Sequence, residues 1–227
     1  MPSWNTCRGA IVQGLTDLCK ELEAFETDPW AAREILDYEL MTPFVLDPCC
    51  GTGALADAAR DRGHRVLTFD IFDWSTIYPC EKPDNVMDFL TYQPMNLGNE
   101  EFTVFMNPPF SKACAFVDKA MEIGARKIVS FQAWSWRSSV GRNEWWIENP
   151  PARIWLCVDR ATCFRFDVPT ECIEPETCSR KKSKKDAKCR LCMGSTPTTH
   201  AFFVWEAGHT GASIICNLRK PKLRKEP

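Results

Sequence analysis

The amino-acid sequence predicts an α/β protein with one largely parallel, seven-stranded sheet that carries helices on both faces. Seven short apolar segments along the chain have the composition of buried strands. Stretches with apolar residues at helical spacing lie between several of them, and this alternation favours parallel strands joined by helical crossovers. Two of the apolar segments stop at glycine-rich or proline-rich turns, which is typical of the edge where such sheets bind ligands.

The first helix is expected within Thr27–Leu40, and it leads into the first strand. Asp28 is a suitable N-cap, and Pro29 suits the first helical position, where a backbone N–H would have no partner in the helix. The short apolar run Phe44–Leu46 predicts a buried strand. A glycine turn and the helix Ala54–Arg62 follow it.

Six further strands are predicted by short runs rich in β-branched and aromatic residues. Another helix, Cys114–Ile123, comes after the two prolines that stop the fourth strand. We expect these strands at Arg65–Phe69, Val86–Leu90, Phe102–Met106, Lys127–Ala133, Arg153–Val158 and Ala201–Trp205.

Chain length and composition predict a single domain that spans residues 1–227. With 227 residues, of which 44% are hydrophobic, the chain can bury one substantial core. Within it we distinguish a cysteine-rich, basic insert at residues 172–192, between the sixth and seventh strands, and a basic tail at residues 217–227. No apolar run has the length of a membrane span and no export leader is evident, so we expect a soluble, cytoplasmic protein.

The net charge of -2 conceals two basic patches on an acidic body. The insert carries seven Lys and Arg residues from Arg180 to Arg190, and the tail carries five more from Arg219 onwards. Without these twelve cations, Asp186 and Glu226, the chain keeps 16 basic and 28 acidic residues. Basic patches commonly contact the phosphates of nucleic acids, and the alternative is a solvated segment without a ligand.

A glycine turn, Gly51-Thr52-Gly53, separates the strand that ends in Asp47 from the helix after it. It places free backbone N–H groups at the carboxyl end of the first strand, where doubly wound sheets bind ligands. Asp70 ends the next strand and can accept hydrogen bonds from both hydroxyls of a ribose. Because Ala56 replaces the third glycine of the dinucleotide fingerprint, the pattern favours a nucleoside cofactor without pyrophosphate. A purely structural turn is the alternative.

The tetrapeptide Asn107-Pro108-Pro109-Phe110 follows the fourth strand and should lie beside the same crevice. The side-chain oxygen of Asn107 and the carbonyl of Pro108 can accept both hydrogens of an exocyclic amine, while Phe110 can stack on the ring that carries the amine. The tetrapeptide therefore predicts a receptor for a planar amine.

Together the two motifs, DPCCGTG and NPPF, resemble those of class I S-adenosylmethionine-dependent methyltransferases, in particular the adenine-N6 DNA methyltransferases of phage and bacteria. The resemblance covers roughly Thr27 to Gly208. It implies a Rossmann-like fold, S-adenosylmethionine as cofactor, and the cytoplasm of a bacterial or phage-infected cell as location. The implied catalytic residues are Asn107, Pro108, Pro109 and Phe110, and the implied cofactor-binding residues are Pro29, Trp30, Asp47, Pro48, Cys49, Gly51, Gly53, Asp70, Asp88 and Phe89.

Two outlying pairs in that set have specific implied contacts. Pro29 and Trp30 match the family segment that holds the methionine end of the cofactor, and Asp88 and Phe89 match the segment that contacts its adenine. Cys49 is expected to be a small packing residue of the turn, like its neighbour Cys50, and not a nucleophile.

The activity implied by the resemblance is methyl transfer from S-adenosylmethionine to the exocyclic N6 amine of adenine in DNA. The reaction is an in-line displacement with the base flipped into the NPPF pocket. Three alternatives stay open: an RNA methyltransferase acting on adenine N6 or guanine N2, a methyltransferase for a protein glutamine, and a non-catalytic nucleic-acid-binding module. We expect DNA, or else RNA, as partner, no membrane, and a monomer or weak dimer.

Residues 135–151 combine basic and aromatic side chains that suit phosphates and unstacked bases. The other interpretation is a surface loop that its two tryptophans, Trp145 and Trp146, hold to the core. With the lysines of the insert, the predicted nucleic-acid contacts are Arg137, Arg142, Trp145, Lys181, Lys182, Lys184 and Lys185.

An odd count of 13 cysteines without an export signal argues against a disulfide framework and favours reduced thiols, some of them on metal. The insert has the spacing C-x5-C-x10-C-x2-C, which can hold a tetrahedral zinc ion and order a hairpin that lacks a core. The alternative is a set of unliganded thiols. The predicted ligands are Cys172, Cys178, Cys189 and Cys192, with His200 or Cys163 as substitutes.

Overall fold

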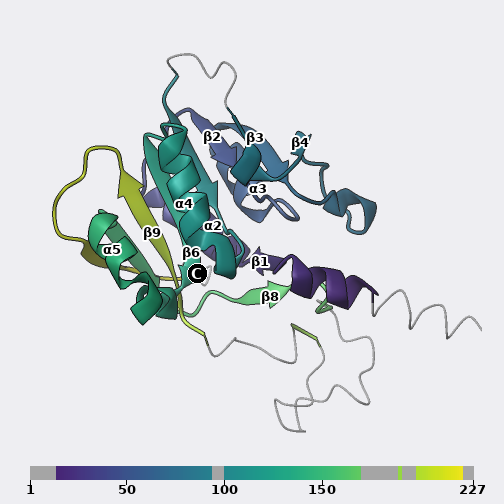
Figure 1. Ribbon diagram of the computed structural model, residues 1–227. Coiled ribbons are helices and arrows are strands. Elements are labelled where there is room, and N and C mark those ends of the chain that lie inside the picture. Colours follow the sequence, from purple (N-terminus) through teal and green to yellow (C-terminus); the bar gives the residue numbers. More distant parts are fainter. Residues whose placement is uncertain (1–13, 94–99, 170–188, 191–197, 222–227) are drawn as a thin grey trace, which may run out of the picture.

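The computed structural model describes residues 14–93, 100–169, 189–190 and 198–221 (Figure 1). Its centre is an eight-stranded sheet. In chain order, the strands of this sheet are β2 (Phe44–Asp47), β3 (Arg65–Asp70), β4 (Asn85–Val86), β5 (Phe102–Met106), β6 (Lys127–Ala133), β7 (Arg153–Cys157), β9 (His200–Glu206) and β10 (Ile214–Leu218).

The strand order confirms the predicted fold class. The strands lie side by side as β10-β7-β9-β6-β5-β2-β3-β4. Strand β9 is antiparallel to its neighbours β6 and β7, and the other neighbouring pairs are parallel. A mostly parallel sheet with one reversed strand in this place is the arrangement of the Rossmann-like class I methyltransferase fold. The order steps outwards from β2 to β3 on one side and from β2 to β5 on the other, which creates a ligand crevice at the carboxyl ends of these strands.

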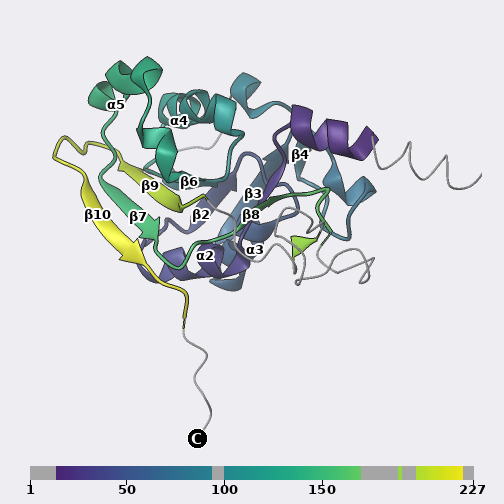
Figure 2. The same ribbon diagram turned by 90° about the horizontal axis from the view of Figure 1, so that it is seen from below.

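Helices cover both faces of the sheet, as Figure 2 shows. Helices α2 (Pro29–Glu34) and α3 (Ala54–Asp61) lie on one face, and α4 (Ala113–Glu122) and α5 (Asn143–Glu148) lie on the other. Two apolar clusters match the two interfaces. One unites Leu46 and Met106 with α4, and the other unites Val45 and Phe105 with α2 and α3. Adjacent strand residues therefore serve opposite layers, as the pleat requires.

The structure differs from the predicted elements in several places. The eighth strand, β10, was not expected, and it pairs with β7 at the edge of the sheet. Strand β4 ends at Val86 because Asp88 caps a short 3-10 helix, Phe89–Thr91, where the sequence suggested more strand. Helix α2 stops at Glu34 and continues only as a 3-10 turn to Asp37, well short of the expected end at Leu40.

A two-stranded antiparallel ribbon lies outside the main sheet and was also not predicted. Its strands are β1 (Phe25–Thr27) and β8 (Cys163–Arg165), and Thr27 pairs with Cys163. Residues 14–21, which are helical, lead into β1. Figure 1 shows the ribbon at the end of the sheet to which the carboxyl ends of the parallel strands point. The ribbon therefore lies next to the expected ligand crevice.

A buried ion cluster joins the amino-terminal ends of β6 and β7. The carboxylate of Glu39, whose side chain is 1% exposed, contacts Lys127 at 2.9 Å and Arg153 at 2.6 Å. Trp155 donates to the same carboxylate at 2.7 Å. Burial would raise the pKa of Glu39, but these donors outweigh it and hold the pKa below its usual value. The cluster lies at the edge of the sheet opposite the ligand crevice and has a structural role.

Candidate active site

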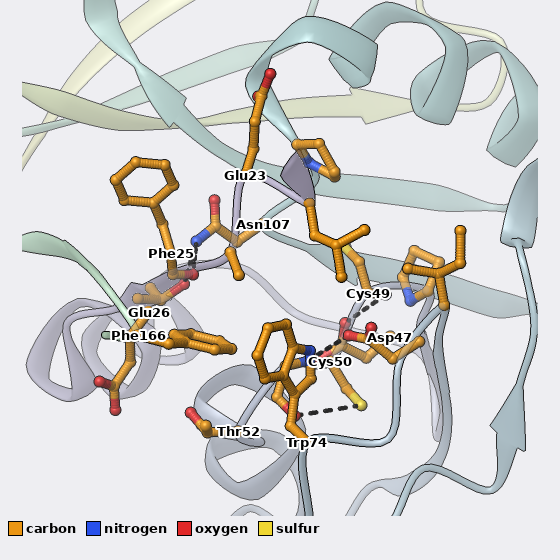
Figure 3. Close-up of a pocket in the computed structure, with 18 of the residues that line it drawn as sticks. Glu23, Phe25, Glu26, Asp47, Cys49, Cys50, Thr52, Trp74, Asn107 and Phe166 are labelled. Carbon is orange, nitrogen blue, oxygen red and sulfur yellow. Dashed lines mark hydrogen bonds between the residues drawn. The ribbon is translucent and has the colours of Figure 1, made fainter. Parts of the chain in front are cut away.

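One cavity at the carboxyl ends of β2, β3 and β5 contains about 930 Å³ of empty space, part of it open to solvent (Figure 3). Residues of six separate segments form its wall, among them β1 and the loop that follows β8. The cavity unites nine of the residues predicted to bind cofactor or to act in catalysis: Asp47, Pro48, Cys49, Gly51, Asp70, Asp88, Phe89, Asn107 and Pro109.

The turn after β2 depends on glycine at two positions. Gly51 has φ +55° and Gly53 has φ +97°, both in the left-handed region that residues with a Cβ avoid. Gly51 also packs closely against Phe166. A Cβ at position 51 would lie 2.6 Å from the end of the phenyl ring, too close for an ordinary contact. Gly53 is the N-cap of α3 and is not in the cavity wall. The absence of a side chain at position 51 therefore leaves room for both Phe166 and the cavity.

Two buried carboxylates stand in the wall at the ends of β2 and β3. Asp70 accepts the N–H of Gly51 at 2.8 Å on one oxygen and the N–H of Phe72 at 3.0 Å on the other. Asp47 Oδ1 accepts the N–H of Cys49 at 3.3 Å, whereas Oδ2 is buried without a hydrogen-bond partner among the described residues. An unpartnered buried carboxylate oxygen in a cavity wall is a place for a cationic or hydrogen-bond-donating ligand.

Burial raises the pKa of both carboxylates. It raises the pKa of Asp47 to about 8, and the N–H groups of Cys49 and Ala56 oppose this only in part. Burial also raises the pKa of Asp70, although the N–H groups of Phe72 and Gly51 favour its ionised form. A positively charged ligand beside Asp47 would favour its ionised form and so gain an ion pair.

The neighbouring thiols are not activated. Burial, together with the charges of Asp47 and Asp70, raises the pKa of Cys49 and of Cys50 above the ordinary value. A thiol with a raised pKa stays protonated at neutral pH and is a weak nucleophile. Their environment agrees with the expectation that both cysteines are packing residues of the turn.

Part of the cavity wall is apolar. It includes Ile71, Trp74, Phe89 and Phe116, and Phe89 is 1% exposed. Asp88 uses one carboxylate oxygen to accept the N–H of Leu90 at 3.0 Å and so caps the helical turn that places Phe89. A planar ring of nucleobase size is the kind of ligand that such a surface accommodates.

The NPPF tetrapeptide is only partly arranged as expected. The amide nitrogen of Asn107 donates to the carbonyl of Phe25 at 3.2 Å and to Thr27 Oγ1 at 3.0 Å. Pro108 is buried outside the wall, and its carbonyl accepts Gln132 Nε2 at 3.1 Å.

Phe110 is also absent from the wall. Its ring packs against Phe25, with 5.3 Å between the ring centroids. The sequence predicts that Pro108 and Phe110 contact the substrate, but in this structure neither residue is positioned to do so. Asn107 and Pro109 are the two residues of the tetrapeptide that face the cavity.

The segment before α2 contributes to the wall in place of Pro29 and Trp30. Asp28 caps α2 and accepts the N–H and hydroxyl of Thr162, at 3.0 and 2.7 Å, which turns the chain away from the cavity. Trp30 packs in the core under the sheet. The wall is formed instead by residues 21–27, which the sequence analysis missed because a three-residue strand has too short a pattern to recognise.

The loop at residues 135–151 has the packing role that was the second interpretation of its sequence. Trp146 is 2% exposed, and Trp145 donates its indole N–H to Asp118 of α4 at 2.8 Å. Arg142 donates to the carbonyl of Trp136 at 3.1 Å, and the guanidinium of Arg137 lies over the Trp146 ring at 4.9 Å. Arg137 stays exposed, so contacts of this loop with nucleic acid remain a prediction.

Most of the predicted zinc and lysine sites lie outside the described residues. This holds for Cys172, Cys178, Cys192, Lys181, Lys182, Lys184 and Lys185. Cys189 is described and buried. Within the described ranges no group of three or more His, Cys, Asp or Glu side chains is arranged to hold a metal ion.

The two substitute ligands belong to the packed interior. His200 is buried, stacks on Phe131 at 5.1 Å and hydrogen-bonds the carbonyl of Ala161 at 3.2 Å. Burial lowers its pKa, so it is neutral at physiological pH. Cys163 is buried in β8. Zinc binding by the insert stays a prediction.

Among the helices that the structure describes, none is long and apolar enough to cross a membrane.

Comparisons with known proteins give a likeness of fold only. No family model and no curated protein matches the chain. Among solved structures, the 23S rRNA methyltransferase ErmE is 15% identical over 79% of this chain and 68% of its own, with a TM-score of 0.46. A dimethyladenosine transferase from Plasmodium falciparum is 12% identical over 79% and 61%, with a TM-score of 0.44. The plantazolicin methyltransferase BpumL, in complex with SAH, is 8% identical over 86% and 89%, with a TM-score of 0.42. At such identities and TM-scores, the function has to be inferred from the residues of the cavity.

Proposed function

We propose that this chain is an S-adenosylmethionine-dependent methyltransferase that acts on the exocyclic N6 amine of adenine in a nucleic acid. The observation that carries the proposal is that a single cavity unites Asp47, Gly51 and Asp70 with Asn107. The first three suit a nucleoside cofactor with a cationic group, and the last suits an amine. The sequence predicts DNA as the substrate, and RNA is the alternative.

The residues of the cavity fit the cofactor. Asp70 accepts the N–H of Gly51 on one oxygen and that of Phe72 on the other, and the side chain of Trp74 also donates to it, so this carboxylate is held in place as an acceptor that a ribose hydroxyl could join. The apolar wall residues Ile71 and Phe89 suit an adenine ring. The unpartnered oxygen of Asp47 suits a positively charged group. When bound, S-adenosylmethionine supplies a methyl group that its positive sulfur already activates.

The protein's contribution to the reaction is orientation and electrostatics. The adenine amine is a poor nucleophile because its lone pair is delocalised into the ring. A hydrogen bond from this amine to Asn107 Oδ1 would favour a tetrahedral nitrogen and stabilise the positive charge that develops on it. The carbonyl of Pro108 keeps one lone pair beyond its bond to Gln132, enough for a second amine hydrogen if the loop adjusts. No general base is needed before the methyl group moves.

The substrate strand is the open part of the proposal. A base in a duplex must first be flipped out, at a cost of a few kcal/mol, whereas a base in a loop or single strand is already available. Two of the similar structures are named as an rRNA and a dimethyladenosine methyltransferase, but TM-scores below 0.5 carry no argument for RNA. Protein glutamine is the remaining alternative, because its side-chain amide is also a planar nitrogen donor.

Methyl transfer from labelled cofactor tests the proposal. The full chain is incubated with methyl-labelled S-adenosylmethionine and random-sequence DNA, RNA of the same sequences, or a glutamine-rich peptide. The nucleic acids are then digested to nucleosides and separated. We expect label in N6-methyladenine nucleosides with the wild type, and label that forms about 100-fold more slowly or worse with Asn107→Ala. Label in guanine or in the peptide would refute adenine as the target, and cofactor binding without any transfer would support a non-catalytic module.

A further inference from the structure

The side-chain amide of Asn107 is held from behind by the β1–β8 ribbon. Its nitrogen lies 3.2 Å from the carbonyl oxygen of Phe25 and 3.0 Å from Thr27 Oγ1. An amide nitrogen has two hydrogens, so both can be used in these two bonds. The side chain also hydrogen-bonds Cys163, which faces Thr27 across the ribbon. The ribbon therefore surrounds this nitrogen with acceptors.

These contacts fix which way the amide points. A backbone carbonyl only accepts hydrogen bonds, so the group of Asn107 that faces Phe25 must be the NH2 and not the oxygen. The oxygen is consequently turned away from the ribbon. Figure 3 shows the amide nitrogen of Asn107 directed at the backbone of Phe25 and the oxygen on the opposite side. The side chain offers the remaining space an acceptor and no donor.

Strand pairing and side-chain packing hold the ribbon in position. Thr27 is 3% exposed, and all three residues of β1 pair with β8. The ring of Phe25 packs on Phe110, so β1 is also fastened to the NPPF tetrapeptide from its other face. Thr27 Oγ1 is a side-chain acceptor in this arrangement, at 3.0 Å from the amide nitrogen, and a substitution can remove it without touching the backbone.

We propose that Thr27 is a positioning residue that, with the Phe25 carbonyl, presents the oxygen of Asn107 to the target amine. The inference rests on the proposed function and adds to it a reason for the choice of residue at position 107. Aspartate at position 107 would place a carboxylate oxygen where the amide nitrogen now donates to the carbonyl of Phe25 at 3.2 Å. Two acceptor oxygens would then face each other without a hydrogen between them and would repel each other. The site therefore requires the amide, and it requires a substrate that donates N–H.

The test compares Thr27→Val, which has the shape of Thr without its oxygen, with Thr27→Ser, which keeps the oxygen. With saturating S-adenosylmethionine, we expect Thr27→Val to lower kcat about tenfold, since it removes one oriented hydrogen bond. Cofactor affinity in isothermal titration should stay within about twofold, because Asp47, Gly51 and Asp70 are untouched. Thr27→Ser should restore most of kcat, and Asn107→Asp should be as inactive as Asn107→Ala.

Wild-type kcat in Thr27→Val, or a Thr27→Ser variant as slow as Thr27→Val, would overturn the inference. A readout that needs no activity separates this failure from failure of the proposed function. In ¹H–¹⁵N spectra, the two side-chain protons of Asn107 should exchange slowly with solvent in the wild type and Thr27→Ser, and rapidly in Thr27→Val. Rapid exchange in the wild type would refute the positioning role even if the protein methylates nothing. Should Thr27→Val fail to fold, Thr27→Ala provides the same comparison.

Discussion

The turn at Gly51 offers the clearest quantitative test of how the cavity is built. Gly51→Ala introduces two penalties. A residue with a Cβ at φ +55° costs about 1–2 kcal/mol, and the new Cβ would lie 2.6 Å from the ring of Phe166, far inside the ordinary contact distance. Overpacking of this kind typically costs about 1–3 kcal/mol. The free energy of unfolding should therefore fall by about 2–5 kcal/mol, which for a domain of this size lowers Tm by about 4–20 °C.

Gly63→Ala is a matched control. Gly63 also has a left-handed backbone, with φ +82°, but nothing lies within 4 Å of the position that its Cβ would occupy. It should cost only the backbone penalty of about 1–2 kcal/mol and leave cofactor affinity unchanged. In a Phe166→Leu background the extra cost of Gly51→Ala should shrink towards that of Gly63→Ala. Urea unfolding of these variants gives the comparison, and equal costs for Gly51→Ala and Gly63→Ala would refute the contact between Phe166 and the turn.

Three further predictions concern charge and metal. Glu39→Ala should lower the free energy of unfolding by about 3 kcal/mol, because it removes the buried carboxylate that two partly buried cations share, whereas Asp37→Ala, which removes an exposed ion pair, should cost at most about 1 kcal/mol. Equal costs in chemical denaturation would contradict the structural role of the Glu39 carboxylate. Because burial raises the pKa of Asp47 to about 8, the folded protein keeps a proton there that the unfolded chain releases near pH 4, and the free energy of unfolding should fall between pH 4 and 8 by up to about 1.4 kcal/mol per pH unit. Urea unfolding at pH 5 and 8 should show this fall in the wild type and not in Asp47→Asn. An equal pH dependence in both proteins would show that Asp47 is already ionised in the folded state. Elemental analysis of purified protein should find stoichiometric zinc that is lost when the cysteines of the insert are replaced by serine, and zinc-free folded protein would exclude the metal site.

Local turn chemistry made half of the candidate site predictable. Asp47 and Asp70 end their strands, Gly51 and Asn107 come soon after a strand, and parallel strands bring their carboxyl ends together whatever the rest of the chain does. These residues could be assigned to one crevice without knowledge of any long-range contact.

The other half depends on contacts between segments that are distant in sequence. The ribbon that holds Asn107 joins FET to CFR, and neither three-residue segment has a recognisable period. Phe166 reaches Gly51 through the same ribbon, and Phe110 turns to Phe25 where the sequence suggested a stacking surface for a base. Trp146 was open to two interpretations because aromatic side chains serve cores and nucleic acids equally well.

The most direct test of the central claim separates binding from turnover in the one cavity. Isothermal titration with S-adenosylmethionine and methyl transfer to nucleic acid are measured for the wild type, Asp70→Ala and Asn107→Ala. We expect Asp70→Ala to lose both cofactor affinity and turnover. Asn107→Ala should bind the cofactor as the wild type does and methylate about 100-fold more slowly or worse. Wild-type turnover in Asn107→Ala, or unchanged cofactor affinity in Asp70→Ala, would contradict a single cavity in which a methyl donor and a target amine meet.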